Sequence, residues 1–272
     1  MPVKPILKPH PEGVRPRLTD AMAEPPDTAL GKAASEEAMD ALATRLEALQ
    51  AALGAQATHA LLVVLQGRDA SGKDGLIRRV FGKLNPALCT VSSFKRPTPI
   101  ELRHDYLWRV HQVMPPRGII GVFNRSHYEE VITVRVHGLQ PKAVWRRRYK
   151  HINAFERMLV DEGVVIRKFF LHVSKEEQRK RLEERLDDPT KNWKFEVGDL
   201  AERALWDAYS AAYEEMLLRC STDETPWYIV PADRNKARDL LVAQVVVEAL
   251  EQIDPKYPKA DPEVLKWRGK IE

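Results

Sequence analysis

Two apolar patterns alternate along most of the chain. Short apolar runs with few charges are typical of buried strands, and apolar residues spaced three or four apart are typical of amphipathic helices. The runs predict strands at about 60–66, 88–94, 118–123, 164–173 and 227–231. The helical spacing predicts helices at about 35–53, 73–84, 98–114, 141–162, 174–186, 199–219 and 235–253.

Because helices separate these strands, the chain is predicted to form βαβ crossovers, which build a parallel sheet with helices on both faces. The expected fold is therefore α/β, with a mainly parallel five-stranded sheet between two helical layers. In such sheets binding sites lie at the carboxyl ends of the strands. The turns after the first, third and fourth strands are expected to meet there.

The two ends of the chain lack this patterning. Residues 1–34 contain seven prolines and predict an extended arm, either disordered or draped over a neighbouring surface. Residues 255–272 are polar and interrupted by proline, and predict an extended tail. We therefore expect one domain at 35–254, which is a size that can bury a substantial core.

The first predicted strand leads into the turn Gly67-Arg68-Asp69-Ala70-Ser71-Gly72-Lys73-Asp74-Gly75. A strand, then GxxxxGK, then a helix is the order of a phosphate-binding loop. Its glycines let backbone N–H groups approach a phosphate, which the helix N-terminus faces, and Lys73 adds a point charge. One position departs from the common pattern, because Asp74 stands where Ser or Thr usually follows the lysine and holds magnesium.

A polar cluster follows the third predicted strand. Such a strand often ends in an Asp that helps to hold magnesium, but here it ends in Asn124 and Arg125. Asp69 or Asp74 in the loop can supply the missing charge. Arg125 can clamp a transferring phosphoryl group, or it can serve only an ion pair with Glu129 or Glu130.

The composition favours a protein of the reducing cytoplasm. Two cysteines form neither a disulfide framework nor a zinc set, and the N-terminus has no apolar signal region. No apolar stretch reaches the roughly 18 residues of a membrane span.

The net charge of +4 is local. Residues 141–194 carry 15 Lys and Arg against 9 Asp and Glu, a net of +6, so the other residues carry 28 against 30, a net of −2. This predicts one polyanion-binding surface, for nucleic acid, nucleotide or polyphosphate.

A helical lid is expected at about 175–198. Arg181 and Arg185 share one helix face, and Lys191 and Lys194 follow in a loop. For each arginine a solvated ion pair is an equally good interpretation. A closing lid would exclude water from a phosphoryl transfer.

Four ordered motifs resemble the second family of polyphosphate kinases. These are the loop 67–75, the strand end Phe123-Asn124-Arg125-Ser126-His127-Tyr128-Glu129-Glu130-Val131, the helix segment 152–159, and Asp188-Pro189-Thr190-Lys191-Asn192-Trp193-Lys194. The resemblance covers residues 35–250. It accounts for Asp74, because an Asp after the loop lysine is normal in that family. Many members have Asp where Asn124 stands, which leaves the acceptor and the direction open.

The resemblance implies a thymidylate-kinase-like P-loop fold with a lid, magnesium dependence (with Mn²⁺ as an alternative), and phosphoryl transfer between inorganic polyphosphate and nucleotides. Carried onto this sequence, the catalytic residues are Asp69, Lys73, Asn124, Arg125 and Arg185, and Asp69 is also the metal ligand. The phosphate- and nucleotide-binding residues are Gly67, Ala70, Ser71, Gly72, Asp74, Gly75, Glu129, Arg181, Lys191 and Lys194.

The expected reaction is polyphosphate-driven phosphorylation of AMP and ADP, with the basic lid and the adjoining helix binding the polyphosphate. Guanine nucleotides are a second choice, and a homo-oligomer is expected without nucleic acid or membrane partners. Two alternatives stay open at this point. One is an ATP-dependent nucleoside monophosphate kinase, and the other is a non-catalytic polyanion-binding P-loop protein.

Overall fold

The computed structural model describes residues 6–26 and 32–271, and the sheet lies at its centre. Five parallel strands are hydrogen-bonded in the order β2-β3-β1-β4-β5. Their bounds are β1 Ala60–Gly67, β2 Cys89–Ser93, β3 Ile120–Asn124, β4 Val164–His172 and β5 Trp227–Pro231. The prediction of a five-stranded α/β sheet is confirmed, and every pairing in it is parallel.

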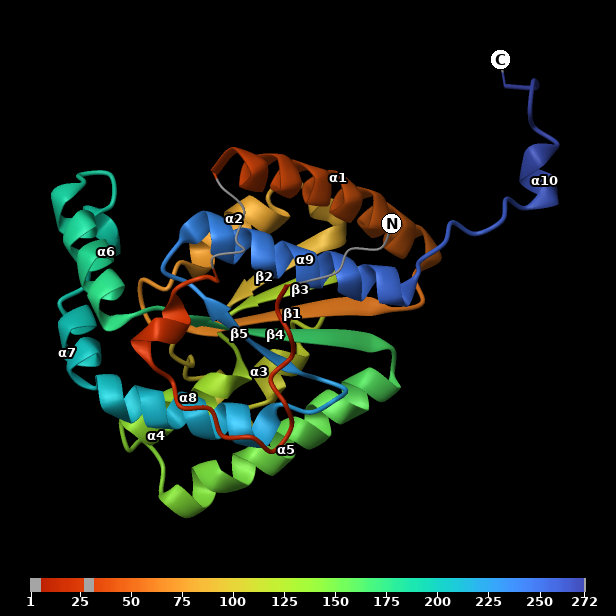
Figure 1. Cartoon of the computed structure of the whole chain (residues 1–272). Coiled ribbons are helices and arrows are strands. Elements are labelled where there is room, and N and C mark those ends of the chain that lie inside the picture. The colour runs from red at the N-terminus through yellow and green to blue at the C-terminus, as the bar shows by residue number, and fades with distance from the viewer. Residues whose placement is uncertain (1–5, 27–31, 272) are drawn as a thin grey trace.

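Helices cover both faces of this sheet (Figure 1). One layer holds α1 Lys32–Gln56, α2 Lys73–Phe81 and α9 Asn235–Ile253. The other holds α3 Trp108–His111, α4 Thr133–Val136, α5 Lys142–Asp161 and α8 Trp206–Cys220. Because β1 is central and covered on both faces, every residue of it is buried, which explains its unbroken apolar sequence.

The lid leaves the carboxyl edge of the sheet. It consists of α6 Lys175–Asp187, a short 3₁₀ turn Asn192–Lys194, and α7 Gly198–Ala204, and it stands beside the sheet and its two helical layers in Figure 1. Ser174 caps α6 by accepting a hydrogen bond from Glu177 N at 3.1 Å, as its capping-box sequence predicts.

Two predicted helices are wrong in their extent. The capping box of Thr98 and Glu101 forms, but only a 3₁₀ turn, Glu101–Arg103, and the short α3 follow it. Ile100 and Leu102 are exposed, so this segment has no buried apolar face to hold a long helix together. The helix predicted at 199–219 breaks at Leu205, where α7 turns away with the lid and α8 continues along the sheet.

The part of the N-terminal arm that the structure describes lies against the domain. His10 N donates to Trp227 O of the edge strand β5 at 2.7 Å, and Ser221 Oγ donates to His10 O at 2.6 Å. Further along, the buried His172 bonds Thr19 O at 2.8 Å. The arm thus covers the β5 edge and then reaches the base of the lid (Figure 1). Residues 1–5 and 27–31 of the predicted arm lie outside the described residues.

The tail beyond α9 leads away from the body in Figure 1 and contains one short helix, α10 Pro262–Leu265. Within residues 6–26 and 32–271, no helix combines the length and the apolar character needed to cross a membrane.

Candidate active site

The phosphate loop connects β1 to α2 at the carboxyl edge of the sheet. Gly72 has a φ of +92°, a left-handed conformation that favours glycine, and α2 begins at the next residue. The Lys73 ammonium folds back over the loop and donates to Gly67 O at 2.8 Å and to Arg68 O at 3.1 Å. Burial lowers the pKa of Lys73 to about 8, and the charge of Arg125 adds to this effect.

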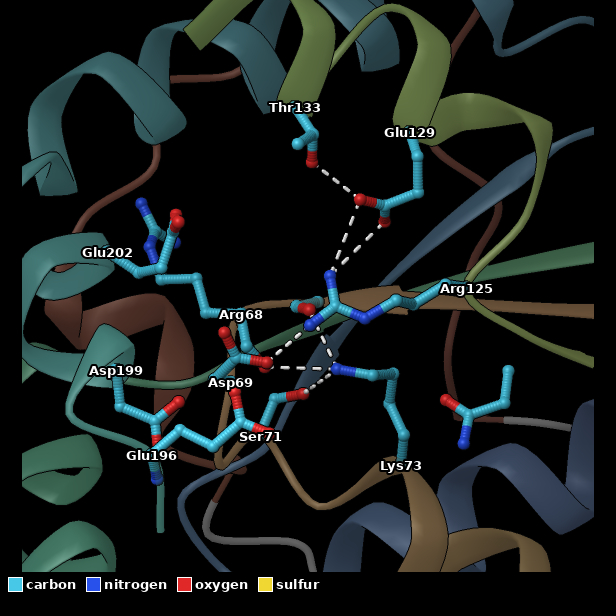
Figure 2. Close-up of polar contacts among 12 residues, drawn as sticks. Arg68, Asp69, Ser71, Lys73, Arg125, Glu129, Thr133, Glu196, Asp199 and Glu202 are labelled. Carbon is cyan, nitrogen blue, oxygen red and sulfur yellow. Dashed lines mark hydrogen bonds and ion pairs between the residues drawn. The ribbon is translucent and has the colours of Figure 1, made fainter. Parts of the chain in front are cut away.

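Arg125 joins the loop to the end of β3 (Figure 2). Its guanidinium pairs with Asp69 and lies 3.4 Å from the carboxylate of Glu129, which accepts a hydrogen bond from Thr133. The carboxylate of Glu129 raises the pKa of Arg125. The backbone of Arg125 has a φ of +61°, which is uncommon for a residue with a side chain. This indicates that the surrounding contacts impose the backbone conformation of Arg125.

Asn124 contacts the residue that departs from the usual loop pattern. Its side-chain amide donates to Asp74 Oδ1 at 2.8 Å. Because β1 and β3 are neighbours, with Leu65 opposite Asn124, the strand end reaches the first turn of α2. The structure therefore brings together the two positions at which the sequence departs from a common P-loop protein.

A cleft of about 1200 Å³ opens beside this group. Its residues come from the loop, from the segment after β2, from the segment after β3, from α5 and from the lid, and include Asp69, Phe94, Lys95, Arg96, Tyr106, Arg109, Arg125, Glu129, Glu130, Arg148, Arg185, Lys194, Glu196, Asp199 and Glu202. Both signs of charge are present. Among the lining residues, Arg148 pairs with Glu130, and Arg109 lies 3.9 Å from the same carboxylate.

The four predicted lid residues lie in three different places. Arg185 and Lys194 line the cleft, where Arg185 Nη1 donates to Lys194 O at 3.2 Å and lies 3.3 Å from Asp199. Lys191 instead pairs with Asp188 at 2.9 Å and is half exposed. Arg181 points to the phosphate loop, where it donates to the backbone carbonyl of Ala70 at 3.0 Å.

Three lid carboxylates that the sequence did not single out also face the cleft. Glu196, Asp199 and Glu202 lie on the other side of Asp69 from Arg125 (Figure 2). Burial raises the pKa of Asp199, because its charged form loses water.

The donor set can be tested against magnesium. Among the described residues, no group of three or more His, Cys, Asp or Glu side chains could hold a metal by itself. Magnesium keeps several waters and is usually bound through one or two carboxylates together with substrate phosphates. Asp69, a carboxylate at the cleft beside the phosphate loop, fits that role.

Comparison with known proteins decides the family. The model of the family "Polyphosphate kinase 2 (PPK2)" matches residues 29–258. The chain belongs to the polyphosphate kinase 2 family. The resemblance of the four sequence motifs is thereby confirmed.

Two relatives of this polyphosphate kinase 2 chain match over nearly their whole lengths. The "AMP/ADP-polyphosphate phosphotransferase" of Meiothermus ruber is 53% identical over 241 residues, which are 88% of this chain and 90% of that protein. The "ADP-polyphosphate phosphotransferase" of Rhodopseudomonas palustris is 47% identical over 84% of each chain. The crystal structure of Polyphosphate Kinase 2 from Arthrobacter aurescens superposes with a TM-score of 0.88 at 36% identity, covering 98% of this chain and 99% of that one.

Two residues that contact the phosphate loop of this polyphosphate kinase 2 chain were not predicted from the sequence. Arg238 in the first turn of α9 is 1% exposed and donates to Ser71 O at 3.2 Å. Gln178 of α6 donates to Asp69 O at 2.9 Å. The sequence held one signal, since Arg238 and Asp239 form an adjacent charged pair directly before the apolar run Leu240-Leu241-Val242-Ala243, which is typical of a buried ion pair.

Proposed function

We propose that this chain is an enzyme that transfers the terminal phosphoryl group of inorganic polyphosphate to AMP and ADP. The observation that carries the proposal is a phosphate loop at the edge of a cleft of about 1200 Å³, which is larger than a pocket for one small ligand. Such a cleft has room for two phosphate-bearing substrates. The relatives named as AMP/ADP- and ADP-polyphosphate phosphotransferases support the same substrates.

In this reaction an oxygen of the nucleotide's terminal phosphate forms a new bond to the terminal phosphorus of the polyphosphate. The bridging P–O bond breaks, and the shortened chain leaves with the electron pair. The attacking oxygen is already ionised at neutral pH, so no general base is needed. Catalysis then rests on positioning the two anions and on neutralising their charge.

The roles follow from the positions of the side chains. Lys73 and Arg125 lie at the loop and would neutralise the transferred group, and Arg185 of the lid, which also lines the cleft, would add to their charge. Asp69 would hold Mg²⁺, or Mn²⁺, together with phosphate oxygens. Such an ion would supply positive charge that offsets the charge of the phosphates.

The cations around the cleft are the proposed contacts of the polyphosphate chain. Lys194, Lys95 and Arg96 line the cleft. On α5 only Arg148 of the run Arg146-Arg147-Arg148 lines it, whereas its two neighbours are exposed. Binding by the exposed part of α5 remains a prediction, as do a role for Lys191, the use of guanine nucleotides, a homo-oligomeric state and a cytoplasmic location.

The decisive test supplies ADP, magnesium and long-chain polyphosphate without ATP. Formation of ATP in proportion to enzyme is expected, and AMP in place of ADP should yield ADP and then ATP. An enzyme that needs ATP to phosphorylate AMP would be a nucleoside monophosphate kinase. Tight binding of polyphosphate without turnover would indicate a non-catalytic protein. Lys73→Ala, checked for folding, should abolish transfer.

A further inference from the structure

Five consecutive backbone carbonyls of the phosphate loop, at positions 67–71, each accept a hydrogen bond from a side chain. Lys73 takes the first two, as described above. The next three are held by side chains from outside the loop, two from the lid helix α6 and one from α9. These contacts are Gln178 Nε2 to Asp69 O at 2.9 Å, Arg181 Nη1 to Ala70 O at 3.0 Å, and Arg238 Nη1 to Ser71 O at 3.2 Å.

The direction of these carbonyls decides which way the loop amides point. A peptide unit is planar, and its C=O and N–H point to opposite sides. Fixing the carbonyls of residues 69–71 therefore fixes the N–H groups of residues 70–72, of which Ser71 N closes the turn on Arg68 O at 3.2 Å. If one of these peptides turned over, a carbonyl oxygen would replace an N–H donor and would repel a phosphate.

The loop needs such support because its backbone adopts an unfavourable conformation at Ala70. Ala70 has a φ of +61°, which is uncommon for a residue with a Cβ and persists where surrounding contacts impose it. Arg238 is packed so closely that a Cβ placed on Gly72 would lie 1.8 Å from its Nη1 atom.

The two arginines are also committed elsewhere. Arg238 donates to Asp239 at 2.6 Å, and Arg181 donates to Glu177 at 2.8 Å and to the carbonyls of Ala232 and Asp233. Their charges are therefore balanced by carboxylates and by backbone dipoles, and their donors are occupied. This pattern is typical of side chains that hold a backbone and differs from that of a phosphate ligand.

We propose that Gln178, Arg181 and Arg238 are positioning residues that act through the phosphate loop, and we name them the carbonyl clamp. They hold the turn of the loop so that the N–H groups of residues 70 and 72 face the phosphate, and they do not touch the phosphate themselves. The inference rests on the proposed function, since it assumes that the loop binds the phosphate chain. It also assigns the first two turns of α6 to the phosphate site, so lid movement relative to the loop begins beyond Arg181.

The test replaces the clamp donors while keeping side-chain volume, in Gln178→Met and Arg181→Met. The matched control is Arg179→Met on the same helix, because Arg179 is exposed and its ion pairs within residues 6–26 and 32–271 are with Glu176 and Glu183 alone. Binding of inorganic tripolyphosphate with magnesium is measured by calorimetry at a temperature where near-UV circular dichroism shows each variant folded. Steady-state transfer from polyphosphate to ADP gives kcat and KM.

Each clamp variant is expected to bind tripolyphosphate about tenfold more weakly. The loss of one hydrogen bond that involves a charged group or a preorganised donor changes a dissociation constant by about this much. The loss should appear in kcat/KM for polyphosphate, while KM for ADP stays near its wild-type value. Arg179→Met should match the wild type, and Arg181→Lys, which keeps one donor, should fall between.

Folded clamp variants that bind tripolyphosphate as the wild type does would overturn the clamp. So would an equal loss in Arg179→Met, because that result reports a general effect of changing α6. A wild-type protein that binds no tripolyphosphate would instead refute the proposed function, so the two failures can be told apart.

Discussion

Replacing Glu156 with Gln tests a buried charge network beneath the strand-end motif. Glu156 and Lys168 are 1% and 0% exposed and pair at 2.5 Å. The carboxylate also binds His127 at 3.1 Å and the hydroxyl of Tyr128 at 2.8 Å, and Lys168 donates to Thr225 at 3.2 Å. Since two of these residues lie in the motif that presents Arg125, the network links the sheet core to the site.

The size of the effect follows from the pKa of Glu156. Burial alone would raise it, but the charge of Lys168 and the hydrogen bond from His127 outweigh burial and lower the pKa from 4.5 to about 2. A difference of 2.5 pKa units corresponds to about 3 kcal/mol of folding free energy above pH 4.5. Leaving Lys168 buried without its carboxylate predicts a loss of the same order in Glu156→Gln.

The sign of the pH dependence is fixed, because the folded pKa lies below the unfolded one. The stabilisation is present above pH 4.5 and is lost progressively as the pH falls toward 2. Urea unfolding of wild type and Glu156→Gln at pH 7, 5 and 3.5 should therefore give a free-energy difference that is nearly constant at the first two values and clearly smaller at the third.

Two controls complete this experiment. Glu224→Gln removes a carboxylate from a surface pair with Arg157 at 3.3 Å and should cost no more than about 1 kcal/mol. The double variant Glu156→Gln with Lys168→Met removes both buried charges and should recover part of the loss. A difference between wild type and Glu156→Gln that is the same at pH 3.5 and pH 7 would refute the reasoning.

Three further predictions concern the loop. Gly72→Ala should lower the unfolding temperature and impair transfer, because its φ is +92° and the new Cβ would meet Arg238, and thermal unfolding with an ADP assay checks both effects. Asn124→Asp places a second carboxylate beside Asp74, so magnesium should raise its unfolding temperature more than that of wild type or Asn124→Ala. Tripolyphosphate affinity should fall as the pH rises above about 8, because Lys73 loses its charge there. Calorimetry from pH 7 to 9.5 should show a fall in affinity of up to tenfold per pH unit. Constant affinity over this range would contradict the prediction.

The sheet could be predicted because each strand carries its own signal. The buried run of β1 and the loop after it fix a parallel strand and a phosphate site within a few residues of one another. Helix extent was harder to predict, because it depends on distant packing. The segment at 98–114 has a true capping box, yet it lacks a neighbouring surface that would bury Ile100 and Leu102.

The site could be predicted only where its residues are contiguous or follow strands. Asp69 and Arg125 were chosen from separate motifs, and parallel pairing of β1 with β3 brings them together. The clamp residues Gln178 and Arg238 lie more than 100 positions along the chain from the carbonyls that they hold. The adjacent pair of Arg238 and Asp239 indicates a buried ion pair but not its contact with the loop, and a glutamine on a charged helix is typical of a solvated face.

The net charge of a sequence segment differs from the charge that the folded protein presents at its cleft. The positive segment at 141–194 includes Lys168, which is buried against Glu156, and Arg148, which pairs with Glu130 in the cleft. Each of these two cations is neutralised by its carboxylate partner. Lys95, outside that segment, lines the cleft, and the described residues include no carboxylate paired with it. The capacity to hold a polyanion therefore depends on which cations remain without carboxylate partners at the cleft, and the net charge of a segment does not measure it.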